Sequence, residues 1–401
     1  MIAVSALFVL AALGCDESIE SAAAALQRND LRAASAILES ARPHCGQSAR
    51  FYELASVAYL RSNNVVEAIK ALEQSAAIDP ADSRVLFTLG TLLAQRGMYA
   101  KAVEYLRRIP DAEADEAAYF NLGLAYSHLK QFENARRSYF LAIDKHPNHV
   151  EAYFRVGLDY AATGDSRKAV PWLFRARELA GDRLDIAYSL SEQLLALRYF
   201  KTAEEVLAAG LEKNPHDLLL TVASGDLDQK KQNRVAAAAK YKEALERQPD
   251  LVAALVGLAQ IAAEEDKEDD AQIYLLDALK IEPTNPLANG QLGVILVHRE
   301  DWDSAITHLK MAWDQDRSNA SLGLELARAL RHAGQYTDAL RLLKTIQPLT
   351  DDSTPLHLEL AQVYSKLHKL SDAQAEREII ARIEERSHDG LRFETPQTYV
   401  H

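Results

Sequence analysis

The 401-residue sequence has little of what builds a catalytic or metal site. It has only two cysteines, and its twelve histidines show no recurrent spacing of the kind that metal ligands need. It contains no glycine-rich phosphate-binding loop and no nucleophile elbow. We therefore expect no enzymatic activity, no cofactor and no metal site.

The sequence also lacks an excess of positive charge and any recognisable linker. Its 58 acidic and 45 basic side chains give a formal net charge of −13, which opposes general binding to nucleic acid. No Gly/Ser-rich or Pro-rich stretch interrupts the chain. We therefore expect no domains joined by flexible linkers.

Long hydrophobic runs are absent too, apart from an apolar segment near the N-terminus. Residues 2–13 are apolar or small, a run too short to span a bilayer, and no Lys or Arg precedes it. Small residues at Ala12 and Gly14 fit signal-peptide cleavage before Cys15, and the segment resembles a bacterial lipoprotein box with Ala12 in place of the usual Leu. We expect an exported protein, periplasmic or membrane-anchored. The alternative is a buried opening helix in a cytoplasmic protein.

What the sequence does have is a strict internal period. Eleven alanines recur every 34 residues, with one step of 33 residues, which indicates stacked supersecondary units. They are Ala34, Ala68, Ala102, Ala135, Ala169, Ala203, Ala237, Ala271, Ala305, Ala339 and Ala373.

A second small residue precedes each of these alanines by twelve positions. It is Ala, Ser or Gly in all eleven units, as at Ser56, Gly123 and Ala259. A turn separates the two positions, and apolar residues recur at helical spacing on both sides. Each unit is therefore predicted to be two antiparallel helices whose backbones approach closely at the small residues.

The second helix is followed in several units by a proline twelve residues after the alanine, as at Pro80, Pro147 and Pro215. With these offsets the sequence resembles the tetratricopeptide repeat family, most clearly in the unit that contains Tyr119, Leu122, Gly123, Tyr126, Ala135, Tyr139, Ala142 and Pro147. The resemblance implies an all-α, right-handed superhelical solenoid of antiparallel helix pairs.

The phase of the alanines sets the expected boundaries. Residues 1–14 form the apolar signal-like segment, residues 15–387 form a continuous solenoid of eleven units with a degenerate first unit, and residues 388–401 form a mobile tail. The units are expected at residues 15–48, 49–82, 83–115, 116–149, 150–183, 184–217, 218–251, 252–285, 286–319, 320–353 and 354–387.

The two cysteines fall at opposite ends of the first hairpin. Cys15 opens its first helix and Cys45 follows its second helix, so an antiparallel pair brings them together. A disulfide is expected if the two Cα atoms lie within about 7 Å. A lipid on the Cys15 sulfur, which would attach the protein to a membrane, excludes that bond. We rank the disulfide above the lipid.

The candidate binding surface is a row of aromatic residues. Phe87, Phe120, Phe154 and Tyr188 lie three residues before the small position in four consecutive units, and in the tetratricopeptide family the first helices line the concave face. Large exposed aromatics would anchor a partner, although half-coverage by neighbouring residues is an equal alternative. Asn121 and Arg155 match two positions by which chaperone-binding members of the family hold a carboxylate, and they are candidate hydrogen-bond donors to a peptide.

Further along the chain the expected lining of the same face becomes polar. It includes Asp226, Gln229, Lys230, Gln260, Glu264, Gln291, His298, Glu325, Arg328, Arg331 and His332. We predict a monomeric protein–protein interaction scaffold that holds a peptide or protein partner in its concave groove, in the bacterial cell envelope. The alternative is a structural subunit or assembly factor of an envelope complex that docks through its convex face.

Overall fold

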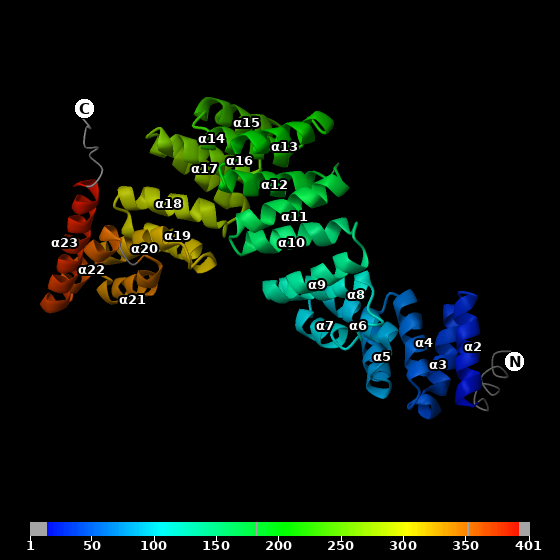
Figure 1. The fold of residues 1–401 in the computed structure, drawn as a ribbon. Coiled ribbons are helices and arrows are strands. Elements are labelled where there is room, and N and C mark those ends of the chain that lie inside the picture. Colours follow the sequence, from blue (N-terminus) through cyan, green and yellow to red (C-terminus); the bar gives the residue numbers. More distant parts are fainter. Residues whose placement is uncertain (1–13, 182, 351–352, 393–401) are drawn as a thin grey trace, which may run out of the picture. The chain divides into compact units, whose positions relative to one another are not determined.

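The computed structural model describes residues 14–181, 183–350 and 353–392, and these residues form helices without any strand (Figure 1). The predicted all-α class is therefore confirmed. The signal-like segment at residues 1–13 lies outside the described residues. The last helix extends through Arg392, beyond the expected boundary at residue 387, so the first five residues of the predicted tail are helical. The rest of that tail lies outside the described residues.

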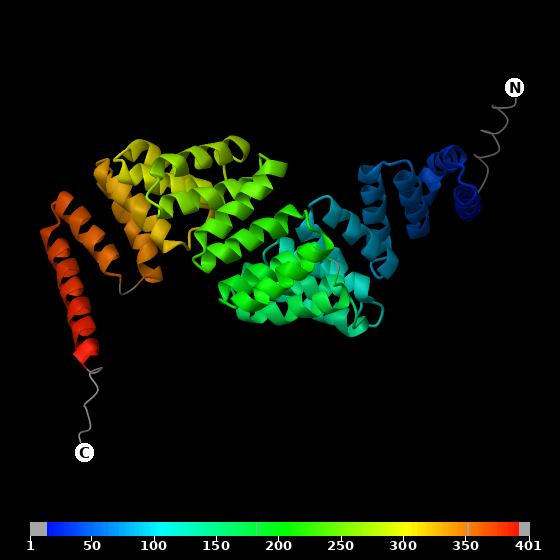
Figure 2. The same ribbon diagram turned by 90° about the horizontal axis from the view of Figure 1, so that it is seen from above.

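The chain separates into two compact parts, residues 1–213 and residues 214–401. Both consist of helix hairpins (Figures 1 and 2). The first part contains α2 (Cys15–Gln27), α3 (Leu31–Cys45), α4 (Ala49–Arg61), α5 (Val65–Ile78), α6 (Ser83–Gln95), α7 (Tyr99–Leu106), α8 (Glu116–His128), α9 (Phe132–Lys145), α10 (Val150–Ala162), α11 (Ser166–Leu179), α12 (Leu184–Ala196) and α13 (Phe200–Lys213).

The second part continues the same alternation of first and second helices. It contains α14 (Leu218–Lys230), α15 (Arg234–Arg247), α16 (Val252–Glu264), α17 (Glu268–Ile281), α18 (Pro286–His298), α19 (Trp302–Gln315), α20 (Ala320–His332), α21 (Tyr336–Ile346), the 3-10 turn η1 (Gln347–Leu349), α22 (Thr354–Lys366) and α23 (Leu370–Arg392). All eleven hairpins begin at the residues that the period predicts. Their continuity as one superhelix stays a prediction.

The small residues lie where the two helices of a hairpin meet. All eleven periodic alanines are at most 1% exposed. The small position on the first helix receives the large side chain that follows the alanine by four residues: a Cβ atom added at Gly157 would lie 2.6 Å from Leu173, and one added at Gly293 would lie 2.5 Å from Leu309. The same contact closes the hairpins with glycine at Gly90, Gly123 and Gly225, so a large side chain fills a gap that only a small residue leaves.

The turn inside every hairpin has one residue in the left-handed region of φ. Only three of these eleven residues are glycines, although glycine adopts this conformation most easily. The others are Asn29, Asn63, Lys130, Arg198, Gln232, Asp266, Glu300 and His368, with φ between 57° and 64°. The residue after each one donates its N–H to a carbonyl of the first helix, as Asp30 does to Ala25 at 2.9 Å. The turn is therefore fixed by backbone hydrogen bonds and tolerates varied side chains.

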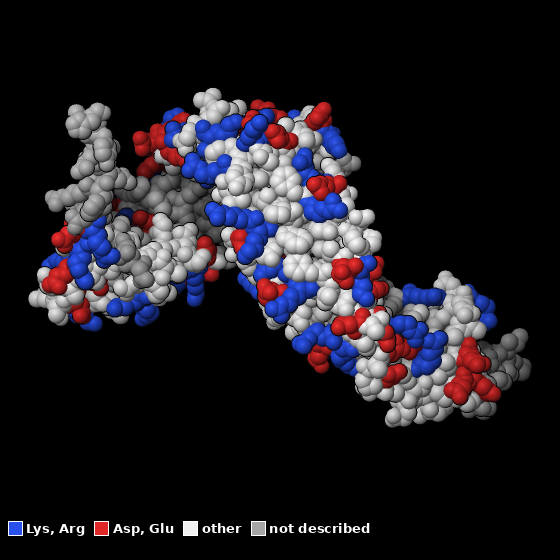
Figure 3. Space-filling model, in the orientation of Figure 1, with Lys and Arg blue, Asp and Glu red and all other residues white. Residues whose placement is uncertain are grey.

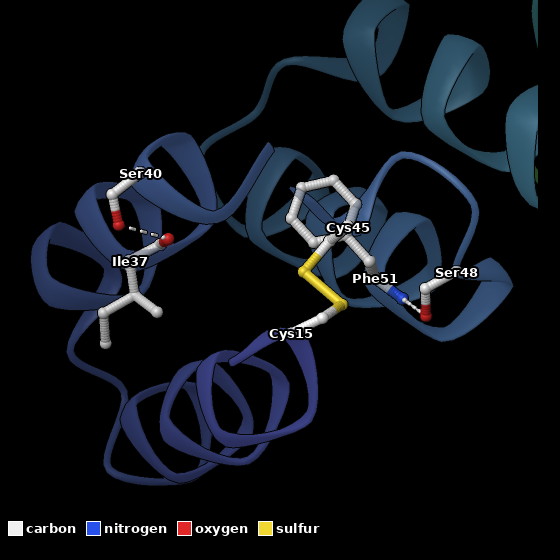
Figure 4. Close-up of a disulfide and its surroundings, with 6 residues drawn as sticks. All are labelled: Cys15, Ile37, Ser40, Cys45, Ser48 and Phe51. Carbon is white, nitrogen blue, oxygen red and sulfur yellow. Dashed lines mark hydrogen bonds between the residues drawn. A yellow bond between two sulfur atoms is a disulfide. The ribbon is translucent and has the colours of Figure 1, made fainter. Parts of the chain in front are cut away.

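Cys15 and Cys45 are joined by a disulfide, with their Cα atoms 5.3 Å apart (Figure 4). The bond links the start of α2 to the end of α3, and Phe51 of α4 lies beside it in the same apolar cluster. The structure thus has the bond that the sequence predicts. Lipidation of Cys15, which would exclude this bond, stays the alternative prediction.

Contacts between hairpins define the inner side of the second part. In the second part the first helices α14, α16, α18 and α20 contact one another in succession, whereas each second helix contacts the first helix of the following hairpin. Helices that pack more closely along a curved stack lie on its inner side. The first helices therefore line the inner surface, as the family resemblance implies.

Candidate functional site

The aromatic row of the first part is more covered than the sequence analysis expects. Phe87, Phe120 and Tyr188 are half-buried, and Phe154 is buried with 5% of its surface exposed. The guanidinium of Arg183 lies 5.1 Å from the centre of the Phe154 ring and is held there by Glu151 at 2.6 Å. Of the two alternatives for this row, coverage by neighbouring residues holds for Phe154, because Arg183 at the end of the same hairpin covers it.

The two predicted hydrogen-bond donors already have partners within the chain. The Nδ2 atom of Asn121 donates to Thr91 Oγ1 at 3.0 Å, and the Nε atom of Arg155 donates to Glu151 Oε1 at 2.9 Å. A peptide would have to compete with these bonds or use the remaining donors. Their predicted role in partner binding stays a prediction.

A buried aspartate near this row was not singled out by the sequence analysis. Asp159 of α10 is 4% exposed, and its Oδ1 atom accepts a hydrogen bond of 2.7 Å from Ser127 at the end of α8. Its Oδ2 atom is buried without a hydrogen-bond partner. Burial raises the pKa of Asp159 to about 6, despite the opposing hydrogen bond from Ser127. The aspartate therefore disfavours the folded state when it is ionised.

We expect Asp159→Asn to stabilise the protein in a pH-dependent way. An aspartate whose pKa is raised on folding loses stability as the pH rises from about 4 through 6, and the amide removes that loss. The difference in the free energy of unfolding between the variant and the parent chain should rise by about 2–3 kcal/mol, in favour of the variant, from pH 4 to pH 7.5. Denaturant unfolding at both pH values measures this difference. Asp144→Asn, which removes an exposed carboxylate of α9, is the control, and equal behaviour of the two variants would refute the assignment.

The second part has a groove of about 590 Å³ on its inner side, between α16, α18 and α20. Its apolar lining comes from Ala263, Pro286, Leu287, Val294, Ile295 and Leu322, with Gly290 between them. Leu287, in the first turn of α18, is 67% exposed. Large apolar side chains left open to water in a groove are typical of a binding surface.

Gly290 deepens this groove at the middle of α18. A Cβ atom added there would meet Leu322 and Ala312 only at ordinary van der Waals distances of 3.6 and 3.7 Å. The position is therefore not a packing gap like Gly293, where a Cβ atom would clash. A glycine that helix packing does not require leaves room for a ligand to approach the helix backbone.

The charged lining of the groove is acidic. No lysine or arginine is among its lining residues. Four carboxylates line it, those of Glu264, Asp266, Glu268 and Glu325. Arginines outside the lining hold some of them in place, since Arg234 donates to Glu264 at 2.9 Å and Arg328 donates to Glu325 at 2.9 Å. Over the face shown in Figure 3, acidic and basic side chains are interspersed.

One polar atom in the groove has no partner. The Oε1 atom of Gln291, on α18, is buried and accepts no hydrogen bond. A buried unsatisfied acceptor is unfavourable unless a ligand or water completes it. Because this atom is closed to solvent, Gln291 would have to change its rotamer to bond to a bound chain.

The polar part of this lining could be predicted from the sequence, and the apolar part could not. Gln260, Glu264, Gln291, His298 and Glu325 were expected on this face and do line the groove. Leu287 was not among the residues expected there. One signal was available: the position six residues before the small residue is Asp16, Arg50, Arg84, Glu151 and Asp185 in five units, but leucine at 219 and 287.

Among the described residues, no group of three or more His, Cys, Asp or Glu side chains is arranged to hold a metal ion. None of the described helices combines the length and the apolar composition that crossing a bilayer requires.

Hairpins of about 34 residues, stacked through small residues, define a helical repeat protein with a grooved inner surface. Models of the tetratricopeptide repeat match residues 59–125, 116–144, 222–286 and 296–357, which together make up more than half of the sequence. The chain belongs to the tetratricopeptide repeat family. This fold supports a protein–protein interaction scaffold.

Similar proteins share the repeats at low identity. The TPR repeat-containing protein YpiA of Bacillus subtilis is 22% identical over 301 residues, which are 74% of this chain and 69% of YpiA. The BBSome complex member BBS4 of Bos taurus is 27% identical over 187 residues, 45% of this chain and 34% of that protein. A crystal structure of a tetratricopeptide repeat protein from Parabacteroides merdae aligns with a TM-score of 0.52 and 17% identity, over 63% of this chain and 100% of that one. The structural likeness supports the fold alone.

Proposed function

We propose that the protein is a non-catalytic, monomeric scaffold that holds an extended segment of a partner protein in the groove between α16, α18 and α20. The exposed Leu287 in this groove is the observation that carries the proposal. A partner's apolar side chain would cover it. The half-buried aromatic row of the first part remains a second, separate surface for a partner.

We also propose that the protein works in an oxidising compartment, such as the bacterial periplasm. The disulfide between Cys15 and Cys45 supports this proposal, because such bonds persist in exported proteins and are reduced in the cytosol. Rapid alkylation of intact cells with a maleimide that adds mass should leave both cysteines unmodified unless a reductant is added first. Modification of both thiols without a reductant would count against export.

The alternative function, docking through the outer surface, has its own structural support. Ile273 and Leu276 of the second helix α17 are 57% and 42% exposed, and neither lines the groove. They form the kind of apolar surface that a structural subunit would present to a larger complex. This surface competes with the groove as the site of partner contact.

We expect Leu287→Gln to weaken binding of a partner purified with the full-length chain. Loss of one well-placed apolar contact should reduce the affinity about tenfold, while stability changes by less than about 0.5 kcal/mol because Leu287 is exposed. Ile273→Gln is the matched control on the outer surface. If Ile273→Gln lowers the affinity and Leu287→Gln does not, the protein docks through its outer surface and the groove proposal is wrong.

A further inference from the structure

The acidic lining narrows the kind of partner that the groove can accept. The segment from Glu264 to Asp270 lies at the mouth of the groove, in the turn between α16 and α17. It contains six carboxylates and Lys267. Asp266, Glu268 and Glu264 line the groove from this turn, and Glu325 lines it from α20. A bound segment therefore has carboxylates on both sides of the apolar floor.

Glu264 and Asp266 are exposed, so their charge acts on a ligand. Burial alone would raise the pKa of Glu264, but hydrogen bonds from Arg234, Gln260 and Gln229 lower it overall. Asp266 is exposed and occupies the left-handed position of the turn, with φ at 58°. Arg234, Arg299 and Arg328 contact Glu264, Glu268 and Glu325 from outside the lining. Within the lining, the Nδ1 atom of His298 lies 2.9 Å from Glu268 Oε1.

The apolar floor and the acidic mouth lie within one groove. A complementary segment therefore has an apolar side chain close to a basic one. The floor at Leu287, Val294 and Leu322 accepts an apolar side chain. The carboxylates repel acidic and phosphorylated segments and attract a lysine or arginine. Lysine also suits a mouth above an apolar floor, because its aliphatic stem packs on apolar surface while its ammonium group reaches the carboxylates.

We propose that this groove selects an extended polypeptide segment in which a lysine or arginine neighbours an apolar residue. The inference rests on the proposed function and adds the charge of the partner to it. Because attraction at a partly exposed site is screened by salt, the preference is strongest at low ionic strength.

The turn itself offers a charge-reversal variant that keeps the fold. Lys130 occupies the same left-handed position in the fourth hairpin, also with φ at 58°. Asp266→Lys therefore introduces a side chain that already occupies the equivalent position in another hairpin. Glu300→Lys, at the equivalent turn after α18 with φ at 60°, is the matched control, because Glu300 does not line the groove.

The test measures binding of three short labelled peptides to the full-length protein by fluorescence anisotropy. One peptide alternates leucine with lysine, one leucine with glutamine and one leucine with glutamate. The lysine peptide should bind at least about tenfold more tightly than the glutamate peptide at low salt. Asp266→Lys should weaken the lysine peptide about fivefold to tenfold, whereas Glu300→Lys should change it by less than about twofold.

The outcomes distinguish a failure of the further inference from a failure of the proposed function. If Leu287→Gln weakens all three peptides equally and Asp266→Lys changes none of them, the groove binds peptides without a charge preference and the further inference is wrong. If Leu287→Gln leaves every affinity unchanged, the groove does not hold these peptides and the proposed function is wrong. Equal weakening by Asp266→Lys and Glu300→Lys would indicate attraction to the chain as a whole and would also overturn the inference.

Discussion

Replacing Tyr241 with alanine is expected to lower the free energy of unfolding of the second part by about 3–5 kcal/mol. The ring is 0% exposed and lies between two first helices. A Cβ atom added at Gly225 of α14 would lie 2.7 Å from it, and one added at Gly257 of α16 would lie 2.5 Å from it. Tyr241 thus fills space in its own hairpin and against the next one, so its loss opens a cavity at both contacts.

The hydroxyl of Tyr241 adds a smaller contribution. It donates to Asp226 at 2.5 Å and also lies 3.1 Å from Gln229 Oε1. Burial raises the pKa of Asp226, and the hydrogen bond from Tyr241 opposes that rise, so the hydroxyl stabilises the ionised carboxylate. Tyr241→Phe, which keeps the ring, should therefore cost only about 1–2 kcal/mol.

Urea denaturation followed by circular dichroism measures both Tyr241 variants. Hydrogen exchange should show the loss of protection concentrated in α14, α15 and α16, because stability in repeat arrays is shared mainly between neighbours. A loss below about 1 kcal/mol for Tyr241→Ala would mean that the ring does not carry the contact between these hairpins.

Removing the disulfide should have a comparable effect at the other end of the chain. The bond closes a loop with a sequence separation of 30 residues, for which the chain-entropy model gives about 3–4 kcal/mol. Cys45 is 1% exposed and packs with Phe51, so the replacement side chain should remain small. We therefore expect the double variant Cys15→Ala, Cys45→Ala to lose protection in α2 and α3.

Hydrogen exchange with mass spectrometry measures this local opening. The parent chain treated with a reductant should lose protection in the same two helices, and helices of the second part should exchange as before. Unchanged exchange in α2 and α3 after either treatment would show that packing against α4 alone holds the first hairpin.

The hairpins could be predicted from the sequence because each depends on contacts within one unit. The small residue, the alanine and the large side chain after it, as at Gly157, Ala169 and Leu173, all recur with the period. Even the degenerate first unit forms a regular hairpin, and its cysteines meet as the antiparallel arrangement requires.

The surfaces could not be predicted as well, because they depend on residues that break the period. Arg183 covers Phe154 from a position where most units have no arginine, and Ser127 of the preceding hairpin approaches Asp159. The groove likewise results from single departures, an exposed leucine at 287 and a glycine at 290. The repeat pattern of the family does not include such residues, because they occur in single units. They nevertheless determine which part of the inner face is open.

Photo-crosslinking from within the groove tests the account most directly. A photoreactive amino acid is placed at Leu287 in one full-length variant and at Ile273 in another, and both are irradiated in the cells that produce the protein. The account predicts a discrete crosslinked partner from position 287 and none from position 273. A partner crosslinked from position 273 alone would contradict it and would assign binding to the outer surface of α17.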